Sequence, residues 1–201
     1  MYKRQLNNNW FLLVEVAGYE GIGSRFEQAL STCHEKDFIA DTTIAHSQTQ
    51  QTNLWDLREN TPEANRISGA ICSSDTAVPI SKVDAFIEHT TIAIREIHAG
   101  LQLNTYGHIG DGNIHHNVLP PEGHNKATFI NENPGIVDMA RMAINDATVK
   151  FEGSISAEHG IGRLKVRDLE RYSDDTKLAA IRSIKEALDP NGIMNPGAVI
   201  A

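Results

Sequence analysis

The chain has 201 residues, of which 40% are hydrophobic, and its net charge is −8 at pH 7. That length fits one domain with enough apolar residues to bury a core, whereas the acidic balance argues against a general nucleic-acid surface. No run of about 18 apolar residues is present, which argues against a transmembrane helix. Cys33 and Cys72 form no CxxC pair, which excludes that type of zinc or thioredoxin motif and fits two buried thiols in a reducing compartment.

Residues 1–9 read as a polar lead-in without the apolar segment of a signal peptide, and a domain is expected over residues 10–201. The domain opens with a predicted buried strand over residues 10–16, WFLLVEV, which Gly18 ends. The pattern then predicts a helix, a second strand and a helix interrupted at Pro62, over residues 24–33, 38–45 and 52–66.

In the second half of the chain, Ser81 is the predicted N-cap of a long helix over residues 82–99. Two strands are predicted after it, over residues 101–106 and 113–119, and then a helix over residues 134–151. Two further helical stretches follow, and an apolar tail over residues 189–201 is expected to dock on the domain. Strands that pair closely between helices predict an α+β fold, a ferredoxin-like antiparallel sheet with helices packed on one face.

The densest chemistry follows the first of those strands, where a tight turn is flanked by histidines. The turn consists of Gly110, Asp111, Gly112 and Asn113. By itself this turn fits either an ordinary hairpin or a weak phosphate cradle. A hairpin here would bring His108 and His115 together, and Asn117 would share the face of His115 because alternate strand residues point the same way.

Two histidines alone do not make a metal centre, because catalytic zinc commonly uses three protein ligands and an open position. The segment SAEHGIG supplies Glu158 and His159 between residues that allow close backbone approach. Each histidine taken singly is more often an ordinary polar residue. Arg58 likewise has two interpretations, a salt bridge on its own helix or a bidentate clamp on a substrate carboxylate.

Several segments in order resemble one family, the FAD-linked oxidase C-terminal domain found in glycolate oxidase, D-lactate dehydrogenases and D-2-hydroxyglutarate dehydrogenases. The matching blocks are LVEVAG, WDLRE, YGHIGDGNIHHNV, ISAEHGIGRLK and ALDPNGIMNPGAVI. The resemblance covers nearly all of residues 10–201. It implies a cap or substrate domain that works over a flavin held by an N-terminal FAD-binding domain, which is absent from this sequence.

The resemblance also implies roles for individual residues. His108, His115 and Glu158 would bind a divalent metal, usually zinc, and His159 would take the hydroxyl proton of a small 2-hydroxy acid. Arg58 would pair with the substrate carboxylate and Asn117 would contact substrate. The turn, from Gly110 and Asp111 through Gly112 to Asn113, is expected to contact the cofactor. Hydride would pass to FAD, because no side chain can accept it.

One departure from the family bears on substrate class, since Ser73 stands where some members carry a lysine. Two other functions stay open from the residues alone, a zinc-dependent hydrolase and a non-catalytic metal-binding module. The hydrolase is disfavoured because the sequence has no HExxH motif. The expected partners are an FAD-binding domain or subunit and no nucleic acid, with a homodimer left open. The expected location is the cytoplasm, peripheral to a membrane only through partners, or the mitochondrion in a eukaryote.

Overall fold

A computed structural model describes residues 10–200 of the chain. The chain divides into two compact units, one ending at Ala64 and the other beginning at Asn65. The predicted lead-in, residues 1–9, lies outside the described residues, as does Ala201. The expectation of a single domain over residues 10–201 therefore stays a prediction.

The first unit contains two helices, α1 (Ile22–Glu35) and α2 (Gln48–Glu59). Ser47 caps α2, because its side-chain Oγ accepts a hydrogen bond of 3.3 Å from the backbone N–H of Gln50. Helix α3 (Thr61–Ile67) spans the boundary between the units. Since α2 ends at Glu59 and Pro62 lies in the first turn of α3, the interruption predicted at Pro62 is observed.

Residues 10–16 do not form the buried strand that their composition predicts. Trp10, Phe11 and Leu12 are 60%, 70% and 72% exposed, and none of them belongs to a strand. The segment is held instead by Trp55, whose Nε1 donates to Glu15 Oε2 at 2.6 Å. A strand needs a neighbour that pairs with its backbone and covers its side chains, and no described residue pairs with this one. Residues 38–45 are irregular as well, although they were expected to form a strand.

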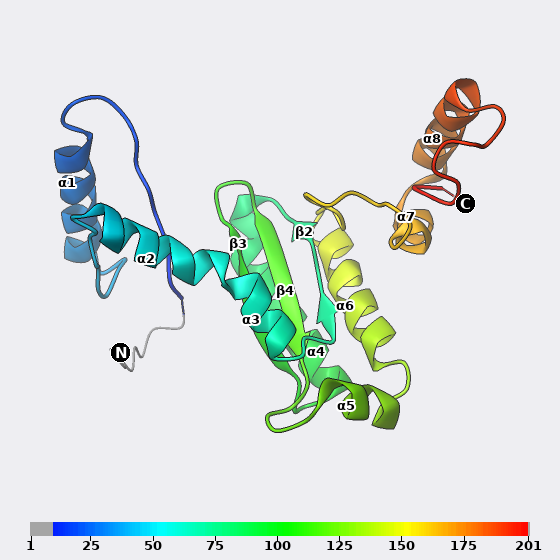
Figure 1. Ribbon diagram of the computed structural model, residues 1–201, viewed down its shortest axis with the longest axis horizontal. Helices are drawn as coiled ribbons and strands as arrows, with labels where there is room; N and C mark the ends of the chain where they lie inside the picture. The colour runs from blue at the N-terminus through cyan, green and yellow to red at the C-terminus, as the bar shows by residue number, and fades with distance from the viewer. Residues whose placement is uncertain (1–9, 201) are drawn as a thin grey trace. The chain divides into compact units, whose positions relative to one another are not determined.

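The second unit is built on an antiparallel sheet with β4 (Asn113–Leu119) at its centre (Figure 1). On one side β4 pairs with β3 (Gln102–His108), and on the other with two short strands, β1 (Cys72–Ser73) and β2 (Thr76–Ala77). Cys72 is opposite Val118 and Thr76 is opposite Ile114. These pairs share one register, so β1 and β2 act as a single strand interrupted at residues 74–75.

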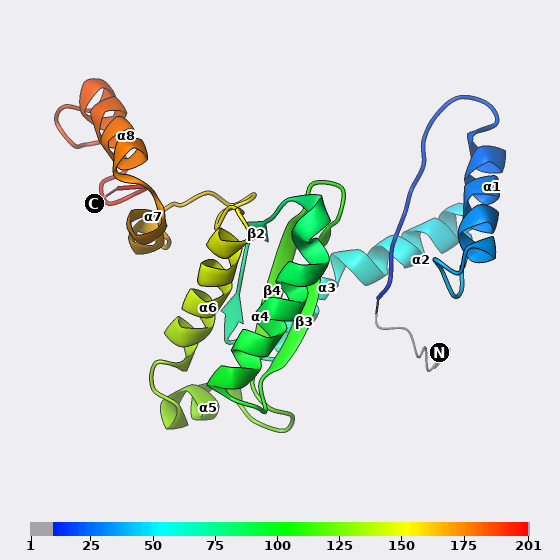
Figure 2. The ribbon, with the colours of Figure 1, turned by 180° about the vertical axis from the view of Figure 1, so that it is seen from behind.

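Helices α4 (Val83–Ile97) and α6 (Ile136–Lys150) lie side by side over one face of the sheet (Figure 2). A short 3-10 turn, η1 (Ile80–Lys82), leads into α4. The predicted cap at Ser81 is wrong, because Ser81 falls inside that turn and α4 begins without a side-chain cap. The polar connection before α6 contains α5 (Lys126–Glu132).

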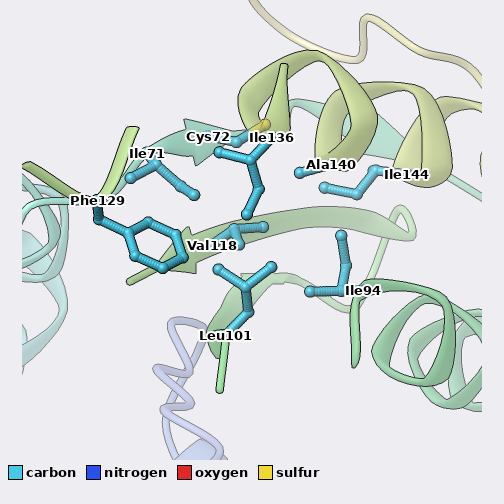
Figure 3. Close-up of a cluster of buried hydrophobic side chains, with 9 residues drawn as sticks. All are labelled: Ile71, Cys72, Ile94, Leu101, Val118, Phe129, Ile136, Ala140 and Ile144. Atoms are coloured by element: carbon cyan, nitrogen blue, oxygen red, sulfur yellow. The ribbon is translucent and has the colours of Figure 1, made fainter. Parts of the chain in front are cut away.

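The core lies between the helices and the even-numbered residues of β4. Figure 3 shows Val118 of β4 among side chains from the surrounding elements: Ile71, Cys72, Ile94, Leu101, Phe129, Ile136, Ala140 and Ile144. A second cluster places Ile114 against Phe86 and Ala147. The α+β class with an antiparallel sheet and helices on one face is thereby confirmed.

Two more helices follow, α7 (Val166–Tyr172) and α8 (Asp175–Leu188). After α8 the carboxylate of Asp189 accepts backbone hydrogen bonds from Ile193 and Met194, both 2.9 Å long, which turns the chain. Val199 then donates its N–H to Gly162 O at 2.7 Å. The tail is thus bonded to the loop that follows residues 158–159.

Candidate functional site

The two faces of β4 differ in chemistry because alternate residues point to opposite sides of the sheet. Ile114, His116 and Val118 face the helices, whereas Asn113, His115 and Asn117 face the other way. Directly opposite residues share a face, and β3 places His108 opposite Asn113 and Tyr106 opposite His115. One face of the β3–β4 hairpin therefore gathers the residues that the sequence singled out.

The turn between β3 and β4 is fixed by a close backbone approach at Gly112. Its φ is +72°, and a Cβ at this position would lie 1.9 Å from the carbonyl oxygen of Val78. Val78 donates its own N–H to Gly112 O at 3.0 Å, and Asp111 Oδ1 accepts from the N–H of Asn113 at 3.1 Å. Only glycine fits this position, so the turn is docked on the segment that follows β2.

His108 and Glu158 lie 50 residues apart in the sequence and come together in the second unit. His108 Nδ1 lies 3.0 Å from Glu158 Oε1, and their side chains are 48% and 43% exposed. An imidazole and a carboxylate at this distance can share a proton or a cation. The structure thus joins the end of β3 to the segment at residues 156–162.

His115 lies near His159, with the two ring centroids 6.2 Å apart. His115 Nδ1 is 3.0 Å from the backbone oxygen of Ser74. Because a carbonyl oxygen can only accept, Nδ1 of a neutral His115 carries the proton, and the lone pair lies on Nε2. This is the second-sphere arrangement that fixes the tautomer of metal-binding histidines.

The donor chemistry at these positions fits a divalent cation, because two imidazoles and a carboxylate are ligands that zinc commonly takes. The geometry does not form a complete metal site. Among residues 10–200, no group of three His, Cys, Asp or Glu side chains is close enough to hold a metal ion. The proposed ligands meet as the pair His108–Glu158, with His115 beside His159. The expected three-residue centre is therefore only partly assembled.

Asn113 has an unusual environment for a buried amide. It is 2% exposed, yet neither Nδ2 nor Oδ1 has a hydrogen-bond partner within the described part of the chain. Asn113 lines a cavity of about 240 Å³ together with Asp111 and Glu158. Since buried polar groups normally have partners, the Asn113 amide stands out beside this cavity.

Three further residues that the sequence singled out are Asn117, Gly110 and Arg58. Asn117 is 3% exposed, and its Nδ2 donates to Asn104 O at 3.2 Å, on the same face as His115. Gly110 has open space around it. Arg58 is half-buried on α2, which belongs to the first unit.

Asp75 and Lys165 were not singled out by the residue pattern, although both contact the loop that carries Glu158. Burial would by itself raise the pKa of Asp75, but the backbone N–H groups of His159 and Glu158 and the ammonium of Lys165 hold that pKa below its usual value. One feature of the sequence could have drawn attention to Asp75. It is a carboxylate inside an extended segment, just before Thr76, and aspartate is disfavoured in strands.

The chain matches the family described as FAD linked oxidases, C-terminal domain, over residues 3–199. A D-2-hydroxyglutarate dehydrogenase of Stutzerimonas stutzeri is 36% identical over 88% of this chain, and a mitochondrial one of Arabidopsis thaliana is 29% identical over 96%. A D-2-hydroxyglutarate–pyruvate transhydrogenase of Saccharomyces cerevisiae is 29% identical over 94%. The alignments cover 38%, 33% and 38% of those relatives, so the chain spans between about a third and two fifths of their length.

Proposed function

Because the chain belongs to the family of FAD-linked oxidase C-terminal domains, we propose that it is the substrate domain of an FAD-dependent D-2-hydroxy-acid dehydrogenase. The reaction would oxidise a 2-hydroxy acid to a 2-oxo acid. The substrate named for the relatives is D-2-hydroxyglutarate, which supports the class of acid. Ser73, which replaces a lysine found in some members, leaves monocarboxylates such as D-lactate as competing substrates.

One observation carries this proposal beyond family membership. The loop at residues 158–159 places a carboxylate against His108 and an imidazole near His115. Residues far apart in the sequence thus converge on one polar face, beside a cavity lined by Asp111, Asn113 and Glu158.

The chemistry assigned to the chain's own residues is binding, orientation and proton transfer. His159 would accept the hydroxyl proton of the substrate, because a neutral imidazole carries a lone pair on one ring nitrogen. Asn117 would orient the substrate from the floor of the same face. Arg58 would hold the carboxylate through its planar guanidinium.

Two groups would complete the site when bound. His108, His115 and Glu158 would hold a divalent cation, probed most simply with zinc, and the turn from Gly110 to Asn113 would contact the flavin. When bound, the cation would supply Lewis acidity toward the substrate hydroxyl, and the flavin would supply the hydride acceptor.

We propose that FAD is held mainly by a separate flavin-binding domain or subunit and that the chain is inactive without it. None of the described helices is long and apolar enough to span a bilayer. A cytoplasmic location, or a mitochondrial one in a eukaryote, is part of the proposal. The mitochondrial alternative is supported by relatives whose names include the word mitochondrial.

The test is a chimera in which residues 10–201 replace the matching region of the Stutzerimonas stutzeri relative. Oxidation of D-2-hydroxyglutarate and D-lactate is followed by reduction of an artificial electron acceptor. The chimera should oxidise at least one of these acids, and His159→Gln should lower kcat by roughly 100-fold or more. A chimera that binds FAD but oxidises no 2-hydroxy acid would refute the proposal.

A further inference from the structure

A buried carboxylate stands directly behind the loop that presents Glu158 and His159. Asp75 lies in the interruption between β1 and β2 and is 6% exposed. Its Oδ1 accepts the backbone N–H of Glu158 at 3.1 Å, and its Oδ2 accepts that of His159 at 3.0 Å. One side chain thus holds two consecutive peptide groups, both belonging to proposed site residues.

Lys165 completes this arrangement from the far end of the same loop. Its Nζ donates to Asp75 Oδ2 at 3.2 Å, to Ser156 Oγ at 3.1 Å and to Ile155 O at 3.0 Å. The ammonium therefore neutralises the buried carboxylate and also binds the start of the loop. A buried charge that lacked such a partner would be costly.

The loop itself has little else to fix it. Residues 157–160 form no helix or strand, and the side chains of Glu158 and His159 are exposed. Gly160 follows with φ +71°, so the backbone beyond the pair is intrinsically adaptable. Besides the two bonds to the Asp75 carboxylate, the N–H of Ala157 donates to the backbone oxygen of Asp75 at 3.2 Å.

We propose that Asp75 and Lys165 are positioning residues, which fix the backbone of Glu158 and His159 so that their side chains meet His108 and His115. This inference rests on the proposed function, because it assigns a purpose to the same site. Neither residue is placed in contact with substrate. Asp75 acts through the peptide groups it binds, and Lys165 acts through Asp75.

Amide hydrogen exchange of the full chain, measured by NMR, tests the positioning role without any metal or substrate. Asp75→Asn should speed exchange at the amides of Glu158 and His159 by roughly tenfold or more, since charge-assisted hydrogen bonds are the strong ones. The amides of the β3–β4 hairpin should change less than about twofold. Asp138→Asn is the matched control, because Asp138 forms an exposed ion pair with Arg141 at 2.9 Å.

Two results would overturn the proposal. If the Glu158 and His159 amides exchange no faster in Asp75→Asn than in Asp138→Asn, the carboxylate does not hold the loop. If exchange accelerates equally throughout the sheet, Asp75 supports the fold in general rather than this loop. Lys165→Met should give the same local pattern and Lys165→Arg should restore protection, whereas identical behaviour of the two variants would remove Lys165 from the role.

Cobalt binding, read from the visible absorption of Co²⁺, tests whether Asp75 and Lys165 affect the proposed metal site. Wild type and Asp138→Asn should bind equally, and Asp75→Asn should bind roughly tenfold more weakly, as expected when groups that orient ligands are removed. Unchanged affinity in Asp75→Asn would contradict the positioning role. Absence of Co²⁺ binding by wild type would instead contradict the metal part of the proposed function, and the exchange measurement would still decide the role of Asp75 and Lys165.

Discussion

His115 and His116 are adjacent in β4, yet their rings occupy opposite faces of the sheet. The ring of His115 lies 6.2 Å from that of His159 on the polar face, whereas the ring of His116 lies 5.3 Å from Phe86 in the core and is fully buried. Thr105 Oγ1 is 2.8 Å from His116 Nδ1. One imidazole is therefore available for chemistry, and the other is a structural residue.

Acid should destabilise the fold through His116. Burial, with a smaller contribution from His115, lowers the pKa of His116 from 6.5 to about 4, so the folded state favours the neutral ring. The stability that this ring contributes is complete above pH 6.5 and is lost progressively as the pH falls toward 4. The total loss is about 3 kcal/mol. Chemical unfolding followed by circular dichroism at pH 7 and pH 4.5 should detect most of this loss in the free energy of unfolding.

Two variants separate this effect from general acid sensitivity. His116→Gln should remove most of the difference in unfolding free energy between the two pH values. His124→Gln should leave it unchanged, because His124 is exposed. Equal pH dependence in both variants would show that His116 is not the group responsible.

The two thiols should differ in reactivity. Burial is the main reason that the pKa of Cys72 is raised from 9.0 to about 11, and its side chain sits in the core cluster beside Ile136 and Ala140. Cys33 is only partly buried. Because the thiolate is the reactive form, iodoacetamide at pH 8 should modify Cys33 in the native chain and Cys72 only after unfolding, as peptide mass spectrometry would detect. Rapid native labelling of Cys72 would contradict its placement.

The turn of the hairpin should tolerate alanine at one glycine and not at the other. Gly112→Ala introduces a Cβ at φ +72° and 1.9 Å from Val78 O, so we expect a loss of about 3 kcal/mol in the free energy of unfolding. Gly110→Ala meets no atom within 4 Å and should cost less than about 1 kcal/mol. The difference between their denaturant midpoints tests the docking of the turn, and matching midpoints would refute it.

Substrate class should respond to Ser73, which is exposed and pairs with Asn117 across the sheet. In the active chimera, Ser73→Lys adds a cation that can attract a second carboxylate. We expect KM for D-2-hydroxyglutarate to fall by roughly fivefold, the effect of about 1 kcal/mol from a partly exposed ion pair. KM for D-lactate serves as the control and should stay within about twofold. Equal changes for both acids would place Ser73 outside the specificity region.

Local sequence was sufficient to predict the hairpin. The glycines of the turn and the flanking β-forming residues agree, and β4 is observed over Asn113–Leu119 as predicted. β3 ends at His108, two residues beyond the predicted end. Register then determines which side chains share a face, so the grouping of His108, His115 and Asn117 followed from the pattern.

Long-range partners could not be predicted in this way. The apolar run at residues 10–16 indicates a preference for burial, but a local pattern does not identify the strand that would pair with it. Asp75 is a similar case, because the peptide groups it binds lie 83 and 84 residues further along the chain. Its importance depends on a loop contact that spacing alone does not encode. The resemblance to the family identified Glu158 and His159, but it did not reveal what holds their backbone.

The most direct test of the shared site is histidine ring ¹⁵N NMR during titration of the full chain with Zn²⁺. The ring nitrogens of His108 and His115 should shift together and saturate near one equivalent, while those of His116 and His124 stay unchanged. Glu158→Gln should weaken this coupled response. Shifts confined to the other exposed histidines, or a response of His108 without His115, would contradict a common metal site on the hairpin.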